Sequence, residues 1–112
     1  MVKVSVLYPA KAGSRFDEKY YFNEHMPMVI RLLAPLLQGV SVETGISSAM
    51  PDQPAPFVMA CHLVFESTEA FYAAFGPHAA AIQGDIPKYT DIEPVIQIGE
   101  IKLSRPVDSV LF

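Results

Sequence analysis

The chain has 112 residues, of which 51% are hydrophobic and 18% are charged, a composition typical of compact globular proteins and not of disordered ones. Eight basic and twelve acidic residues give a net charge of −4, with no cluster of Lys or Arg, so we expect neither nucleic acid nor an anionic membrane as a partner. A single cysteine, Cys61, leaves no pair for an internal disulfide.

The length favours one domain over residues 1–112. No apolar run is long enough to cross a bilayer, and the first residues lack the pattern of a secretory signal. We therefore expect a cytoplasmic protein.

The first predicted elements are a strand and a long helix. Valines alternate with other residues over 2–8, which is the two-residue period of a strand. Ser14, with Asp17 three residues later, resembles a capping box and predicts a helix over about 16–37. Pro27 has no backbone N–H, so this helix is expected to be bent or interrupted there.

Two strands are predicted next, separated by a proline-rich loop. Residues 40–46 alternate as the second strand, and 50–56 form the loop. Residues 57–65 give the clearest strand, which is apolar on both faces and is therefore expected to be covered on both sides. One of its faces carries Phe57, Met59, Cys61, Leu63 and Phe65.

The last third of the chain predicts a helix and a final strand. The helix begins at Ser67 or Thr68, and 79–83 form a further helical turn. Residues 84–93 are predicted to be irregular, and 95–103 form the last strand. The tail after Pro106 is expected to pack on a partner.

The order strand, helix, strand, strand, helix, strand predicts an α+β fold of the ferredoxin-like βαββαβ kind. Its single antiparallel sheet would carry both helices on one face. Because the strand over 57–65 is apolar on both faces, a second copy of the chain is expected to cover the open face, giving a homodimer.

His25 is the leading candidate for chemistry. It lies three and four residues after Phe22 and Tyr21, so aromatic side chains share its helix face. Because Pro27 cannot donate to the carbonyl of Asn23, the backbone is expected to kink or break beside the imidazole. Two interpretations stay open: a half-buried core histidine, or a group that transfers protons or holds a ligand.

The other polar residues give weaker indications of a functional role. The three histidines show no metal-ligand spacing, and no nucleotide-binding loop is present, so we expect no metal and no cofactor. Cys61 is interpreted as an inert thiol in the core or in a pocket wall. His62 points to the opposite strand face, where an interface role is favoured. The segment 85–90 is either a capped turn or a loop that closes a pocket with Tyr89.

Several short segments, taken in order, resemble the signature of the EthD family, named for ethyl tert-butyl ether degradation. They are Val6-Leu7-Tyr8-Pro9, Gly13, Phe16-Asp17, Tyr20-Tyr21, His25-Met26-Pro27, Phe65-Glu66-Ser67, Ala70-Phe71, Asp85-Ile86-Pro87, Tyr89-Thr90 and Gln97-Ile98-Gly99-Glu100. The resemblance covers about residues 2–103. It implies the dimeric α+β barrel superfamily, in which two ferredoxin-like sheets pack face to face.

The resemblance also implies a cleft between the helices and the sheet of each subunit. Relatives of this fold include cofactor-independent monooxygenases, polyketide cyclases, methylmuconolactone methylisomerase and haem-degrading enzymes. The likeness to the isomerase implies a general acid/base role for His25. Met59 occupies the strand position at which the cyclases carry a pocket histidine, which argues against a cyclase reaction.

The leading functional hypothesis is a cofactor-free lyase, isomerase or oxygenase acting on a small apolar carbonyl or phenolic metabolite in catabolism or secondary metabolism. His25 would be the general acid/base. Tyr21 or Tyr89 would orient a substrate oxygen, and Met59 and Cys61 would form the pocket wall. The alternatives are a non-catalytic accessory protein that binds a hydrophobic metabolite, and a haem-binding protein with an imidazole at the iron.

Overall fold

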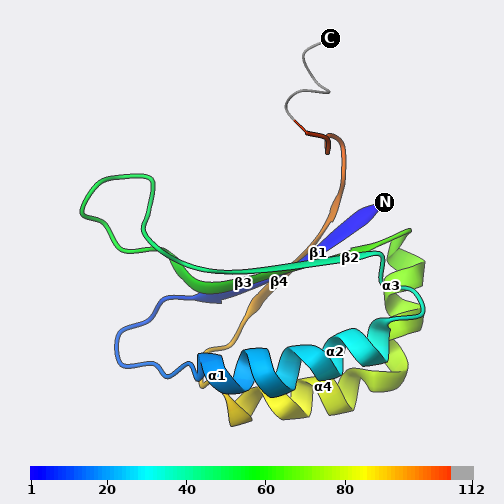
Figure 1. Cartoon of the computed structure of the whole chain (residues 1–112), viewed down its shortest axis with the longest axis horizontal. Helices are drawn as coiled ribbons and strands as arrows, with labels where there is room; N and C mark the ends of the chain where they lie inside the picture. Colours follow the sequence, from blue (N-terminus) through cyan, green and yellow to red (C-terminus); the bar gives the residue numbers. More distant parts are fainter. Residues whose placement is uncertain (107–112) are drawn as a thin grey trace.

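The sheet predicted from the sequence is present in the computed structural model, which describes residues 1–106. Four antiparallel strands lie in the order β2-β3-β1-β4, and the helices lie on one face of the sheet (Figure 1). The strands are β1 (Val2–Pro9), β2 (Gly39–Thr44), β3 (Phe57–Phe65) and β4 (Val95–Glu100). The ferredoxin-like βαββαβ prediction is therefore confirmed. The predicted partner contact of the tail after Pro106 lies outside the described residues.

The first helical segment is continuous but not regular. It consists of α1 (Glu18–Tyr20), a π-helical turn (Tyr21–His25) and α2 (Met26–Leu33). The predicted Ser14 cap is wrong, because Asp17 accepts a hydrogen bond from the Tyr20 N–H and is itself the N-cap. The hydroxyl of Ser14 instead bonds to the carbonyl of Lys11.

The second helical segment is longer than predicted. Ser67 caps α3 (Thr68–Phe75), as expected, and a 3₁₀ turn (Gly76–His78) leads into α4 (Ala79–Asp85). A further 3₁₀ turn covers Ile86–Lys88. The irregular connection predicted to begin at residue 84 is therefore wrong in its first part, since the helix continues through Asp85.

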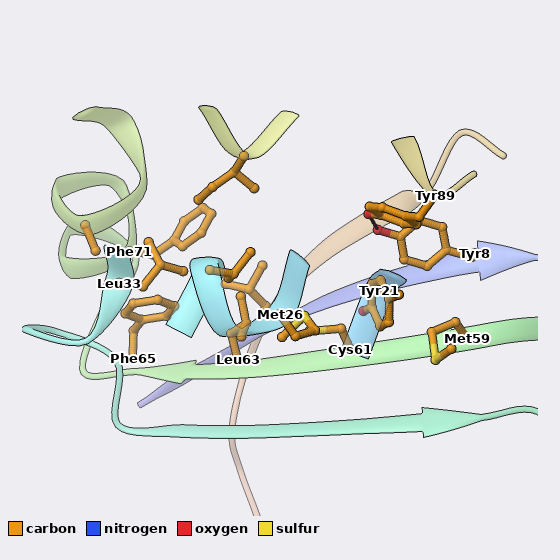
Figure 2. Close-up of a cluster of buried hydrophobic side chains, with 14 of the residues drawn as sticks. Tyr8, Tyr21, Met26, Leu33, Met59, Cys61, Leu63, Phe65, Phe71 and Tyr89 are labelled. Carbon is orange, nitrogen blue, oxygen red and sulfur yellow. Dashed lines mark hydrogen bonds between the residues drawn. The ribbon is translucent and has the colours of Figure 1, made fainter. Parts of the chain in front are cut away.

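The core lies between the helices and one face of the sheet. Alternate residues of β3 are buried on this face, among them Met59, Cys61 and Leu63, and Figure 2 shows Cys61 and Leu63 next to Met26 of α2. In the sheet register, Val6 of β1 pairs with Cys61, and Tyr8 pairs with Met59. These pairings bring β1 side chains to the floor of the helix–sheet layer.

The opposite face of the sheet carries no helix within residues 1–106 (Figure 1). The β3 residues that point there, Val58, Ala60, His62 and Val64, are only partly buried, unlike their neighbours on the helix side. No helix in the described part of the chain is both long and apolar enough to cross a membrane.

Candidate active site

The π-helical turn determines where His25 lies. The N–H of Met26 bonds to the carbonyl of Tyr21, five residues earlier, and widens the helix by one residue. Pro27 follows directly and cannot donate to the preceding turn, so the regular ladder of hydrogen bonds is already incomplete at this point. The expected irregularity is present, but the helix continues through α2 without a break. Single π turns within helices occur frequently at functional sites.

His25 is buried and bonded to a carboxylate from another helix. The residue is 4% exposed, and its Nδ1 lies 2.8 Å from Oδ2 of Asp85, the last residue of α4. The hydroxyl of Tyr20 donates to the second carboxylate oxygen of Asp85 at 2.8 Å, and the ammonium of Lys88 lies 3.6 Å from the same oxygen. Asp85 therefore has partners on both oxygens.

The charge states of this pair follow from burial and hydrogen bonding. Burial lowers the pKa of His25 below 6.5, and the bond to Asp85 opposes this only in part. Burial acts to raise the pKa of Asp85, but the hydrogen bonds from His25 and Tyr20 outweigh it and hold the pKa below 3.8. At neutral pH the pair is a neutral imidazole beside a carboxylate. Because a carboxylate can only accept, Nδ1 carries the proton and Nε2 is the basic nitrogen.

Tyrosines surround the imidazole on its other sides. The hydroxyl of Tyr89 lies 3.4 Å from Nε2 of His25, and it also lies 2.6 Å from the hydroxyl of Tyr8. The ring of Tyr21 is nearly parallel to the imidazole, with the ring centroids 5.6 Å apart. Burial raises the pKa of Tyr8 to about 12 and also raises that of Tyr89, so both hydroxyls keep their protons at neutral pH.

A cavity of about 300 Å³ adjoins these residues, between the helices and the sheet. This volume is at the small end of the range for ligand sites and fits a small molecule. Its wall is mostly apolar and includes Val6, Met26, Val29, Ile82, Pro94 and Ile96. Tyr8, Tyr21, His25 and Cys61 add polar groups to the wall, and Figure 2 places Tyr21 and Cys61 on facing elements. The exposed side chains of Gln83 and Glu93 also line it, so they lie where the cavity meets solvent.

The structure brings together most of the site residues predicted from the sequence. His25, Tyr21 and Cys61 line the cavity. Met59 and Tyr89 are fully buried and are not part of the cavity wall, although Tyr89 reaches His25 through its hydroxyl. Burial raises the pKa of Cys61 to about 11, so it is a neutral thiol at neutral pH and a poor nucleophile.

Two residues of the site were missed. Asp85 is not among the predicted site residues, because the sequence leaves its segment, 85–90, as either a capped turn or a loop that closes a pocket, although its place in a segment that resembles the EthD signature is a signal. Tyr8 is predicted as a strand residue within a segment that resembles the EthD signature, and not as a residue of the site. Its signal was the alternation of β1, which puts Tyr8 on the same face as Val4 and Val6.

His62 lies away from this site, on the open face of the sheet, as the strand alternation predicted. Its Nδ1 lies 2.8 Å from the hydroxyl of Ser5, and its Nε2 lies 3.2 Å from a carboxylate oxygen of Glu43. Within residues 1–106, no group of three or more His, Cys, Asp or Glu side chains is arranged to hold a metal ion.

Comparison with known proteins identifies the family. The model of the EthD domain matches residues 14–93. The crystal structure of an EthD-like protein from Ralstonia eutropha JMP134 is 44% identical, with a TM-score of 0.88 over 93% of this chain and 94% of that one. An EthD family protein from Bacillus halodurans C-125 is 24% identical, with a TM-score of 0.69 over 90% and 98% of the two chains.

A more distant structure, HapK from Hahella chejuensis, is 15% identical with a TM-score of 0.54 over 96% of this chain and 99% of that one, and it shows the fold alone. No curated protein matches the chain. The family model covers most of the chain, and the Ralstonia protein resembles it over nearly its whole length. The chain is therefore a member of the EthD family.

Proposed function

We propose that this protein is a cofactor-independent enzyme of the lyase, isomerase or oxygenase type, with His25 as its general acid/base. Its substrate would be a small apolar carbonyl or phenolic metabolite. The observation that carries this proposal is the His25–Asp85 pair at the wall of an apolar cavity. A buried histidine fixed by a carboxylate, beside space for a ligand, is a recurring arrangement for proton transfer.

The pair supports proton transfer in two ways. Asp85 holds the imidazole in the tautomer whose Nε2 carries the basic electron pair, and it stabilises the imidazolium that forms when Nε2 takes a proton. Removal of a proton from a phenolic O–H, or from a C–H next to a carbonyl, gives a phenolate or an enolate. Return of that proton at another atom is an isomerisation, and bond cleavage from the enolate is a lyase reaction.

The charges around the cavity support an uncharged substrate. No Lys or Arg of residues 1–106 lines the cavity, and the carboxylate of Glu93 lies at its edge. An anionic ligand would lose its hydration there without gaining a positive partner. In an apolar site this costs on the order of 5 kcal/mol. A neutral ketone or phenol avoids this cost.

A non-catalytic protein that binds a hydrophobic metabolite is the second candidate. It is favoured by the contacts of His25, since both of its ring nitrogens already have partners within the protein, Asp85 and Tyr89. A binder would use the same apolar cavity but would not move a proton to or from its ligand.

Proton exchange into a probe ketone separates the two candidates. Phenylacetone carries acidic C–H groups beside its carbonyl, and their exchange in D₂O is followed by NMR. We expect the protein to accelerate this exchange over an equal concentration of imidazole, and His25→Asn to lower the rate by about 10²- to 10⁴-fold. His78→Asn, which removes a histidine outside the cavity wall, is the matched control and should keep the wild-type rate.

Saturation-transfer NMR of phenylacetone establishes binding in each variant. Bound ketone with equal exchange rates in wild type and His25→Asn would mean that the protein is a binder. A wild-type protein that does not accelerate exchange at all would also contradict the enzymatic proposal.

We also propose that two copies pair through the open face of the sheet. The support is the partly buried apolar row of β3, Val58, Ala60 and Val64, which residues 1–106 leave without a covering layer. A second copy would bury this row and the Ser5–His62 contact together. Stable pairing of this kind buries about 1,200–2,000 Å² in total.

A further inference from the structure

Neither nitrogen of His25 is free for a ligand in the cavity. Nδ1 bonds to Asp85 at 2.8 Å, and Nε2 lies 3.4 Å from the hydroxyl of Tyr89. Tyr89 is 0% exposed and does not line the cavity. Its hydroxyl, however, lies 2.6 Å from that of Tyr8, which does line the cavity. A hydrogen-bonded path therefore connects the imidazole to the cavity through two tyrosines.

The carboxylate of Asp85, at one end of the path, determines which group donates in each hydrogen bond along it. The carboxylate of Asp85 can only accept, so Nδ1 of His25 donates to it and Nε2 must accept. The hydroxyl of Tyr89 is then the donor to Nε2, and its oxygen accepts the proton of Tyr8. The hydroxyl oxygen of Tyr8 is left with its acceptor capacity, at the cavity end of the path.

We propose that Tyr8 is the residue that takes the proton of the substrate, and that Tyr89 relays a proton from Tyr8 to Nε2 of His25. This inference rests on the proposed function and deepens it, because it names the group that touches the substrate. It also assigns Asp85 and Tyr20 as positioning residues at the far end of the path, where the Tyr20 hydroxyl donates to Asp85 at 2.8 Å.

The atoms and charges of the step balance. The substrate X–H bond breaks and a new O–H bond forms on Tyr8, while the original proton of Tyr8 passes to the oxygen of Tyr89. The original proton of Tyr89 passes to Nε2. The substrate keeps the electron pair as an enolate or phenolate, and the imidazolium lies beside the carboxylate of Asp85. Transfer in the opposite direction returns a proton to the product, and no electron acceptor is required.

The local packing supports a concerted transfer. Since burial raises the pKa of both tyrosines, a free tyrosinate is unfavourable, and each hydroxyl must gain a proton as it loses one. The backbone of Tyr89 is fixed, because its carbonyl accepts the Asp17 N–H at 2.7 Å. The contact between Tyr89 and His25, at 3.4 Å, is longer than a good O–H···N hydrogen bond. It is therefore the link that must shorten for transfer.

A double-mutant cycle tests the relay with phenylacetone exchange as the readout. We expect Tyr89→Phe and Tyr8→Phe each to lower the rate by about 10²-fold or more. We expect the double variant His25→Asn/Tyr89→Phe to be no slower than His25→Asn alone, because one missing link already interrupts the path. Tyr72→Phe, which removes the hydroxyl of a tyrosine that is 60% exposed, is the control for the substitution itself.

The outcomes separate the relay from the function on which it rests. If His25→Asn slows exchange but Tyr89→Phe does not, His25 meets the substrate directly, and the relay is wrong while the enzymatic proposal stands. Effects of His25→Asn and Tyr89→Phe that multiply would also overturn the relay, since they would indicate a structural role for Tyr89. If His25→Asn has no effect, both proposals fail. Should Tyr89→Phe not fold, the same cycle is made with Tyr8→Phe.

Discussion

Nδ1 of His25 lies 2.8 Å from Oδ2 of Asp85, although the two residues are 60 positions apart in the chain. The first residue is held by a π-helical turn and the second by the end of α4, so the pair exists only when these two helical segments pack together. The chemistry that we propose depends on this contact, and the following predictions address it and its surroundings.

Replacing Asp85 should remove activity while leaving the fold intact. In Asp85→Asn the amide can donate to Nδ1, which would favour the tautomer with the proton on Nε2 and remove the basic nitrogen. We expect phenylacetone exchange to fall by about 10²-fold or more. Asp52→Asn, in an exposed loop position with a φ of 68° that Asn also tolerates, is the matched control. A wild-type rate in Asp85→Asn would contradict the assigned tautomer.

Stability should fall in acid, in two steps. The pKa of His25 is lowered below 6.5 on folding, so the unfolded chain binds this proton more readily and the folded state loses stability as pH falls below about 6.5. The pKa of Asp85 is also lowered, which adds a second loss below about pH 4. Urea unfolding at a series of pH values measures both losses. His25→Asn should abolish the first, and a first loss of unchanged size in that variant would contradict the burial of a neutral His25.

Restoring a backbone N–H after the π turn should separate activity from stability. Pro27→Ala supplies the missing donor and a better helix former, so a regular α-helix becomes available and the side chain of His25 would rotate relative to Asp85. We expect the melting temperature to stay constant or rise, while phenylacetone exchange falls at least tenfold, on the order of the cost of a misplaced catalytic group. Full activity in Pro27→Ala would mean that the π turn does not position the imidazole.

A charge on the open face of the sheet should prevent pairing of two copies. Val64 lies there at one end of the apolar row of β3, so Val64→Glu would place a carboxylate at the proposed interface. Light scattering after size exclusion should then give a dimer for the wild type and a monomer for the variant. Lys19→Glu, an exposed position of α1 in the helical layer on the other face of the sheet, is a charge-changing control that should remain dimeric. A monomeric wild-type protein at micromolar concentration would contradict the pairing.

The sequence was sufficient to predict the elements that depend on local pattern. The alternation over 57–65 located both ends of β3, and the order of strands and helices predicted the fold. The helix start was wrong because Asp17 and Ser14 are both good capping residues, and their spacing alone does not show which one is used.

Only part of the site could be predicted, because its contacts cross the fold. The aromatic turn and Pro27 indicated His25, and strand alternation indicated Cys61. No local period connects His25 with Asp85 or Tyr8, since helix packing and sheet register decide those distances. Met59 shares a strand face with Cys61, but it pairs with Tyr8 in the sheet and is fully buried. The strand face of a residue therefore does not by itself predict whether the residue lines the cavity.

The tautomer and pKa of His25 give the most direct test of the central claim. Two-bond proton–nitrogen NMR spectra of the histidine-labelled protein, recorded across the pH range, report both properties for this ring. We predict a neutral imidazole at pH 7 with its proton on Nδ1, and a pKa below 6.5. A proton on Nε2 at pH 7, or a pKa above 6.5, would contradict His25 as the base held by Asp85.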